Sequence, residues 1–207
     1  MRFKGLWRAL LVVSIAVGVG LAADDAADDK APFQPRPVGE YPHKQTSENV
    51  TIAAQQIVTD EQASAAFGKL NPWRHGVLPV LVVIRNDGPN PLRLDKMRIY
   101  YTLPGGTRAE PTPGQDLKYL QGPRQPKMVN GPLGGIRTTK TKNPLAAWEI
   151  EGREFRARLI PPGQTASGFF YFEASVNSEA ASIYIAGLED AVTHQELYYF
   201  DIPLSGK

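Results

Sequence analysis

The chain of 207 residues contains no cysteine, three histidines and three methionines. The lack of cysteine excludes a disulfide framework, a thiol nucleophile, a thiolate metal site and lipid attachment at an N-terminal cysteine. His43, His75 and His194 are far apart, whereas zinc and copper sites usually take closely spaced ligands such as His-x-His. The sequence therefore predicts neither a metal nor a cofactor.

Familiar catalytic patterns are also missing from the sequence. There is no Gly-x-Ser-x-Gly and no Ser-x-x-Lys, and neither Ser167 nor Ser175 has a neighbouring pattern that implies activation. Glu149, Glu151 and Glu154 lie among Arg153, Arg156 and Arg158 at cross-strand spacings, which indicates surface charge pairing. We therefore predict no catalytic residues and expect that the chain is not an enzyme.

The first 23 residues have the three parts of a secretory signal peptide. A basic start precedes an apolar run, and Gly20 and Ala22 are small residues suited to a cleavage site. The apolar run from Ala9 to Ala23 is short for a membrane span of about 20 residues. We expect cleavage and export, with a periplasmic or envelope-associated location; an uncleaved N-terminal anchor is the alternative.

Cleavage changes the charge of the chain. The full sequence has 23 Lys and Arg against 21 Asp and Glu, but removal of Arg2, Lys4 and Arg8 leaves 20 against 21, a net charge of −1. The basic character therefore belongs to the signal segment. It gives no reason to expect a nucleic-acid partner.

The mature chain is expected to begin with a tether. Residues 24–46 are acidic and then rich in proline, a composition that buries too little apolar area to offset the entropy of ordering. A folded domain is expected over residues 47–207, beginning with the strand-like "NVTIAAQQI". Thr59 and Gln62 then have the spacing of a capping box, which predicts one short helix over about residues 60–69.

The most apolar stretch, "VLPVLVVI", predicts a strand buried on both faces. The turn-forming "NDGPNP" follows it, and "LRLDKMRIYYTL" then alternates apolar and polar residues with a phase shift near Asp95 that indicates a bulge. We interpret the two runs as an antiparallel hairpin, with the helix over residues 60–69 covering the outer face of its first strand.

Later segments repeat this pattern. Residues 155–159 alternate, an aromatic run follows over residues 169–172, and residues 181–204 have the appearance of a last hairpin. The sequence therefore predicts a mainly β protein, an antiparallel immunoglobulin-like β-sandwich of about seven strands with one short helix.

Three segments carry a family resemblance: "AFGKLNPWRHGVLPVLVVIRNDGPNPLRL", "LIPPGQTASGFFYFE" and "GLEDAVTHQELYYFDIPL". They resemble exported bacterial immunoglobulin-like proteins of unknown function, in which a helix ending in Phe-Gly leads into a Gly-x-x-Pro-Val strand. The resemblance implies a sandwich fold and export, and it assigns no role to any residue.

Residues 104–148 do not fit a sandwich, because they are dense in proline and glycine and lack a strand pattern. Between Asp116 and Glu149 the sequence has six basic residues and no acidic one: Lys118, Arg124, Lys127, Arg137, Lys140 and Lys142. One hypothesis is a basic arm that contacts an anionic partner, with Tyr119 and Trp148 as aromatic anchors. The other is a solvated insertion whose ends are attached to the sandwich by Tyr119, Leu120, Leu145 and Trp148.

The sequence thus predicts a non-catalytic, exported envelope protein that acts as an interaction or assembly module, presenting edge strands and residues 104–148 to another envelope component. Its partner would be an envelope protein or an anionic envelope polymer. A binding protein for an anionic lipid or glycan, using the basic 118–142 loop, is the alternative, and an unrecognised hydrolase is a third.

Overall fold

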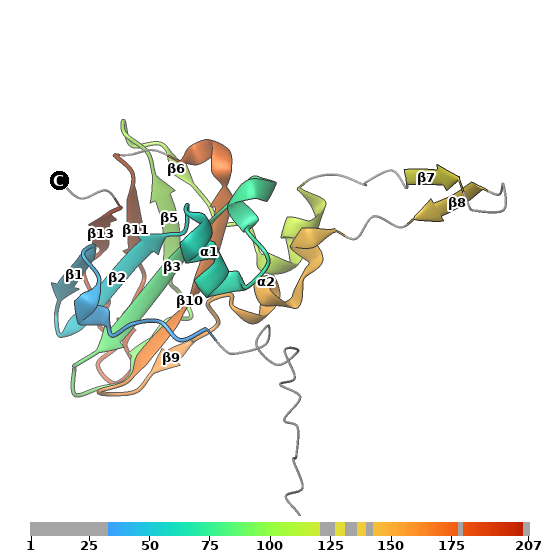
Figure 1. Cartoon of the computed structure of the whole chain (residues 1–207). Helices are drawn as coiled ribbons and strands as arrows, with labels where there is room; N and C mark the ends of the chain where they lie inside the picture. Colours follow the sequence, from blue (N-terminus) through green and yellow to red (C-terminus); the bar gives the residue numbers. More distant parts are fainter. Residues whose placement is uncertain (1–32, 121–126, 131–135, 140–142, 178–179, 205–207) are drawn as a thin grey trace, which may run out of the picture. The chain divides into compact units, whose positions relative to one another are not determined.

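The computed structural model of the chain in Figure 1 describes residues 33–120, 127–130, 136–139, 143–177 and 180–204. The chain divides into two units, residues 1–31 and 32–207, and every described residue belongs to the second. The predicted signal peptide therefore lies outside the described residues. Within the described part of the chain, no helix has the length and apolarity needed to cross a membrane.

The apolar run singled out in the sequence forms the central strand of a four-stranded antiparallel sheet. In spatial order the strands are β1 (Lys44–Ser47), β2 (Val50–Gln56), β3 (Val77–Asn86) and β10 (Thr165–Glu173). β10 pairs with β3 from Thr165 opposite Arg85 to Glu173 opposite Val77, and β2 pairs with its other edge. Nearly all residues of β3 are buried, as expected for a strand with neighbours on both sides and covers on both faces.

A second four-stranded antiparallel sheet has the order β13 (Phe200–Pro203), β11 (Ser182–Ala186), β5 (Arg98–Thr102) and β6 (Arg108–Ala109). Its strands alternate between buried and accessible residues. In β5, for example, Ile99 and Tyr101 are buried whereas Arg98 is exposed. This alternation is typical of a sheet with one face on a core and the other toward solvent.

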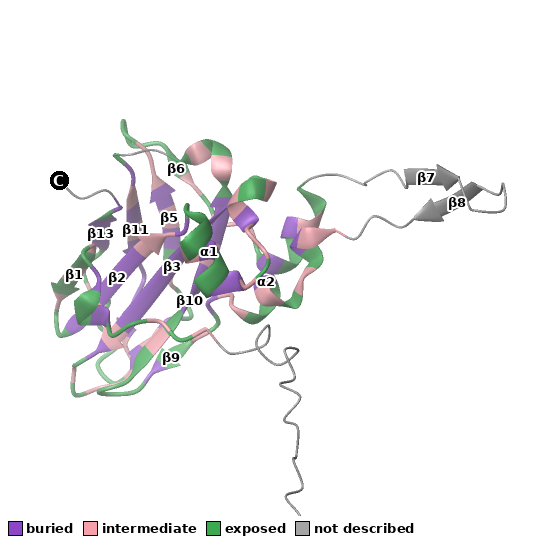
Figure 2. Cartoon of the chain, viewed as in Figure 1, coloured by how far each residue is buried: buried purple, intermediate pink, exposed green. Residues whose placement is uncertain are grey.

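The two sheets share one hydrophobic core, and the buried residues of their strands are purple in Figure 2. Val80 and Val82 of β3 lie in the same cluster as Ile99 of β5, Ile183 of β11 and Phe200 of β13. Full burial of a side chain of this size contributes about 1.5–3 kcal/mol. The prediction of a mainly β, antiparallel fold is confirmed.

The opposite face of the first sheet has its own cover, as the fully apolar β3 predicts. Helix α1 (Asp60–Phe67) places Phe67 against Phe169 of β10, with ring centroids 4.7 Å apart. Both capping-box bonds are present, between the Thr59 side chain and the Gln62 backbone and in return. The predicted helix is confirmed, although it ends two residues early because Gly68 takes a positive φ of 63°.

Both lateral edges of the sandwich are closed. On one side the Gln45 side chain accepts a 2.9 Å hydrogen bond from the Asp201 backbone, so that β1 and β13 are linked. On the other side, Thr112, after β6, donates a 2.7 Å backbone bond to Tyr171 of β10. Phe155 donates to Phe169 along the same edge. These bonds occupy groups that an edge strand would otherwise offer to another chain.

The predicted tether, residues 24–46, extends too far into the fold. Within its described part, a 3-10 helix η2 (Val38–Glu40) packs on the first sheet, β1 is the edge strand of that sheet, and Tyr41 is buried. The Tyr41 hydroxyl accepts a 3.1 Å bond from the Arg36 backbone. Proline spacing indicated a solvated chain, but two large apolar side chains, Val38 and Tyr41, gain enough burial to order it.

The predicted hairpin between β3 and the next strands is wrong. β3 belongs to the first sheet and β5 to the second, so the "NDGPNP" segment carries the chain across the sandwich. On the way, β4 (Leu92–Arg93) pairs with β9 (Leu159–Ile160) and β12 (Glu189–Asp190) in a small third sheet. The predicted bulge near Asp95 corresponds to the break between β4 and β5.

The count of about seven strands is too low, because the two larger sheets alone contain eight. Short pairings such as β6 and β9, with two residues each, have no length over which alternation is visible. Residues 104–148 also contain elements that the sequence did not indicate. They include η4 (Gly114–Tyr119), β7 (Lys127–Asn130), β8 (Ile136–Thr139) and η5 (Pro144–Ala146), before α2 (Trp148–Gly152).

Candidate functional site

The predicted basic segment contains a small antiparallel hairpin. We call residues 121–142 the arm, and residues 117–120 and 143–148 the arm root. β7 and β8 pair with Lys127 opposite Thr139 and Val129 opposite Arg137. Arg124, Lys140 and Lys142 lie outside the described residues. The structure therefore describes the backbone at two of the five basic positions of the arm.

The arm root is attached to the cover of the first sheet. Leu117 of η4 and Leu145 of η5 are almost completely buried in the second hydrophobic cluster, together with Phe169 and Tyr171 of β10. Leu145 was among the four residues expected to attach the ends of the insertion, and that expectation is confirmed. Leu117 was missed because it stands alone in a polar stretch with no periodic partner.

The other three expected attachments, Tyr119, Leu120 and Trp148, are exposed instead. Their exposed fractions are 70%, 41% and 47%, so two aromatic rings and a leucine of the arm root face solvent. Lys118 lies over the Tyr119 ring, with its Nζ 5.2 Å from the ring centroid. The arm root therefore combines accessible apolar surface with positive charge.

Two side chains, Tyr171 of β10 and Arg153 after α2, hold the segment that carries Trp148. The Tyr171 hydroxyl donates a 2.7 Å hydrogen bond to the Ile150 carbonyl, which ties α2 to the sheet, and burial raises the pKa of this phenol. The Arg153 guanidinium lies 5.6 Å from the Trp148 ring centroid and 5.8 Å from that of Phe67, and burial lowers its pKa. Trp148 is thus held by a cation–π contact while its ring stays accessible.

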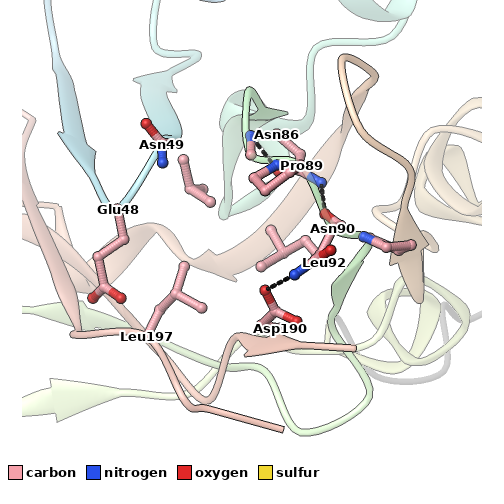
Figure 3. Close-up of a pocket in the computed structure, with 11 residues that line it drawn as sticks. Glu48, Asn49, Asn86, Pro89, Asn90, Leu92, Asp190 and Leu197 are labelled. Atoms are coloured by element: carbon pink, nitrogen blue, oxygen red, sulfur yellow. Dashed lines mark hydrogen bonds between the residues drawn. The ribbon is translucent and has the colours of Figure 1, made fainter. Parts of the chain in front are cut away.

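A second candidate is a pocket of about 300 Å³ at one end of the sandwich, shown in Figure 3. It is formed by the β1–β2 turn, the crossover after β3 and the chain after β12. Its polar lining includes Glu48, Asn49, Asn90 and Asp190. In Figure 3 the Asn90 amide points to Asp190, to which it donates a 3.0 Å hydrogen bond.

The polar groups of this pocket are mostly committed to the fold. Asp190 also accepts 2.9 Å bonds from the Val192 and Thr193 backbone, and these contacts hold its pKa at about 2. The buried Asn86 amide donates to the Asn90 and Ile160 carbonyls and accepts from Gly88. The pocket therefore fixes three loops, and it offers few unsatisfied groups to a ligand.

Next to this pocket, Glu189 is a buried carboxylate with three partners. Arg93, Lys96 and His194 each approach it at 2.9 Å. The hydrogen bond from His194, followed by that from Lys96, lowers the Glu189 pKa to about 2. The cluster joins β12, β4 and the turn after β12, so we assign it to the fold.

The accessible face of the second sheet carries a third candidate, which we call the tyrosine row: Tyr100, Tyr184, Tyr199 and Arg108. Tyr100 and Tyr184 are opposite each other on β5 and β11, with ring centroids 6.3 Å apart. Tyr199 stacks on Tyr184 at 5.3 Å. The sequence pattern did not predict this row, although the polar phase of "MRIYYTL" and "ASIYIAG" contains both central tyrosines.

The histidines and carboxylates do not form a metal cluster in the described part of the chain. His43 precedes β1, His75 ends η3 (Pro72–His75), and His194 lies in the turn after β12. Ser175 donates to Glu173, and Glu154 accepts a 3.0 Å bond from the Gly114 backbone. The first contact is local, whereas the second links the start of η4 to the chain after α2.

Comparison with known proteins does not identify the chain. No family model matches it, and no curated protein matches it. Among solved structures, it is similar to a conserved hypothetical protein from Bacillus anthracis with a TM-score of 0.32 and 7% sequence identity, over 78% of this chain and 92% of that chain. At this score the likeness supports neither a fold family nor a function.

Proposed function

We propose that this chain is a non-catalytic, exported interaction or assembly module of a bacterial envelope, and that the arm and its root contact an anionic partner. An immunoglobulin-like arrangement of the sandwich is part of the proposal. Two four-stranded antiparallel sheets around one core support that part. The resemblance to exported immunoglobulin-like proteins points the same way.

One observation carries the functional proposal: Tyr119 and Trp148 are exposed while their neighbours Leu117 and Leu145 are buried. A solvated insertion needs only the buried pair to attach it. Exposed aromatic side chains next to cations are enriched where proteins contact partners, because they supply a large contact area at a small entropy cost. Here they flank a stretch with five basic and no acidic residues, and the sixth basic residue, Lys118, adjoins Tyr119.

The closed edges of the sandwich argue against a partner that binds by strand addition. The Asp201 amide on β13 and the Tyr171 carbonyl on β10 are already bonded within the chain. Recognition by side chains, such as those of the arm root, is more consistent with these occupied edges.

A second candidate, binding of an anionic lipid or glycan through the same loop, is favoured by the Lys118–Tyr119 contact. Tyrosine and tryptophan beside lysine and arginine suit the headgroup region of an anionic membrane surface. Both candidates use the positive charge of the loop. They differ in the partner, which is another envelope component in the first candidate and a lipid or glycan in the second.

The test uses the mature chain and a variant with glutamine at all six basic positions. Immobilised chains are incubated with native envelope extract and, separately, with phosphatidylglycerol vesicles. An assembly module should retain a protein from the extract, a lipid binder should retain vesicles, and either should fail in the variant and weaken between about 0.05 M and about 0.5 M salt. Retention that is unchanged by the substitutions and by the salt concentration would overturn the proposal.

A further inference from the structure

Cross-strand pairing explains only part of the arrangement of the tyrosine row. Tyr184 is directly opposite Tyr100 on one side and Asp201 on the other. Such pairs commonly stabilise sheets. Tyr199, however, precedes β13, remains 57% exposed, and stacks on Tyr184 with an interplanar angle of 24°. The ring of Tyr199 is therefore partly open to solvent.

Arg108 is the positively charged member of the row. Its guanidinium carbon lies 4.1 Å from the Tyr184 ring centroid and 5.5 Å from that of Tyr100. Among the described residues, the guanidinium makes no ion pair with an acid, and Asp201 on the same face is not paired with it. Stacking fixes the plane of the guanidinium while its N–H edges remain available.

We propose that the tyrosine row is a binding site for a carboxylated glycan, meaning an oligosaccharide that contains uronic acid units. A sugar ring has an apolar C–H face and a rim of hydroxyls. The exposed ring of Tyr199 can stack on the C–H face, and the phenol groups of Tyr100 and Tyr184 can form hydrogen bonds with the sugar hydroxyls. The fixed Arg108 fork suits a carboxylate, which it would hold by two parallel hydrogen bonds.

Each residue has a distinct role in this site. Arg108 and Tyr199 contact the ligand. Tyr184 contacts both, because its ring centroid lies 4.1 Å from the Arg108 guanidinium carbon and 5.3 Å from the Tyr199 ring centroid, and it acts by positioning them. A rigid site of this kind loses little entropy on binding, because the rings and the guanidinium already have their bound positions.

A peptide partner is less well matched to this face. The backbone groups of β11 are paired on both sides, to β5 and β13, so no strand can be added there. Tyr100, Tyr184 and Tyr199 do not line any of three pockets found in the described part of the chain. A ligand is therefore recognised by stacking and by side-chain hydrogen bonds on an open surface.

The experiment measures affinity for three polymers by gel retardation. Polygalacturonate carries sugar and carboxylate, its methyl ester carries sugar without the charge, and polyglutamate carries the charge without sugar. Because the basic arm also attracts anions, each measurement is repeated in the six-glutamine arm variant. Preference for polygalacturonate over both other polymers is expected in both backgrounds, so this proposal is separable from the one for the arm.

Substitutions then locate the site. Arg108→Gln should weaken polygalacturonate binding by about tenfold or more, and Arg108→Lys should weaken it nearly as much because the planar fork is lost. Tyr199→Ala should weaken binding and Tyr199→Phe should largely retain it. Arg36→Gln is the matched control, since Arg36 also stacks on a tyrosine, 4.9 Å from the Tyr41 ring centroid, on another surface.

Two results would overturn the proposal. The first is polygalacturonate affinity that is unchanged by Arg108→Gln in the arm variant. The second is equal retardation by polyglutamate, or by the methyl ester, because recognition would then need only charge or only sugar. Circular dichroism of each variant verifies that these exposed substitutions leave the fold intact.

Discussion

The side-chain amide of Asn143 donates a 2.6 Å hydrogen bond to the backbone carbonyl of Lys118. The two residues are 25 positions apart and stand at the two ends of the arm. The same side chain accepts a 3.0 Å bond from the Leu145 backbone, which caps η5. One asparagine therefore closes the arm and begins the element that attaches it to the core.

Asn143→Ala removes both bonds, and we expect it to lower the free energy of unfolding by about 1–3 kcal/mol. Asn143→Asp is the matched control, because it keeps the capping oxygen and replaces the amide donor to Lys118 with a charged oxygen. Urea denaturation of the three chains measures the difference. If Asn143→Asp were as stable as the natural chain, the bond to Lys118 would contribute nothing.

Gly168 of β10 is required by a close approach of two backbones. A Cβ at this position would lie 2.4 Å from the Phe155 Cα, in the segment that borders β10. Gly168→Ala should therefore destabilise the fold by about 1–3 kcal/mol or more, through forced separation of the two segments. Gly39→Ala is the control, because a Cβ there meets nothing within 4 Å. Thermal unfolding that ranks the two variants equally would contradict this account of the β10 edge.

The Glu189 cluster predicts a specific acid dependence. Its contacts with His194 and Lys96 lower the carboxyl pKa from 4.5 to about 2, so the folded state favours the charged form. The resulting stability is complete above a pH of about 4.5 and is lost as the pH falls toward about 2. Glu189→Gln should be less stable than the natural chain near neutral pH.

Glu189→Gln should also make the free energy of unfolding depend less on pH between 4.5 and about 2. Unfolding midpoints of the two chains, measured at about pH 7 and about pH 3, give the comparison. Asp116→Asn, at an exposed position in η4, is a control for the general effect of removing a carboxylate. A midpoint difference between natural and Glu189→Gln chains that is the same at both pH values would exclude this linkage.

Thr59 supplies the capping box of α1, and its loss should weaken the cover of the first sheet. The Thr59 hydroxyl accepts a 3.2 Å bond from the Gln62 backbone. We expect Thr59→Ala to cost about 1 kcal/mol, and Thr59→Ser to cost little because serine can make the same bond. Hydrogen exchange of the α1 amides reports the local effect. Unchanged protection in Thr59→Ala would mean that packing of Phe67 alone holds the helix.

Residue patterns predicted the elements whose periodicity is long enough to be seen. The uniformly apolar β3 and the Thr59–Gln62 cap both led to the correct structure. The order of the strands was not predictable in the same way, because "NDGPNP" suits a hairpin turn and a crossover between sheets equally well. Two-residue strands such as β4 and β12 are defined by their partners and have no pattern of their own.

The candidate sites show a similar limit. Charge along residues 118–142 is visible in the sequence, and so is the presence of Tyr119 and Trp148. That Tyr119 and Trp148 are exposed while Leu117 and Leu145 are buried is a result of packing in the folded chain, which the sequence pattern does not show. The tyrosine row brings together residues of four separate segments, so only the register of β5, β6, β11 and β13 shows that they are neighbours.

Photo-crosslinking tests most directly whether the arm root is the contact surface. A benzophenone amino acid is placed at Tyr119, at Trp148 and, as controls, at the exposed Val58 and Val192. After irradiation in native envelope extract, we expect the same adduct from positions 119 and 148, its loss when the six basic residues are glutamine, and none from the controls. No adduct at either root position, or an adduct from Val58 or Val192 alone, would contradict the account.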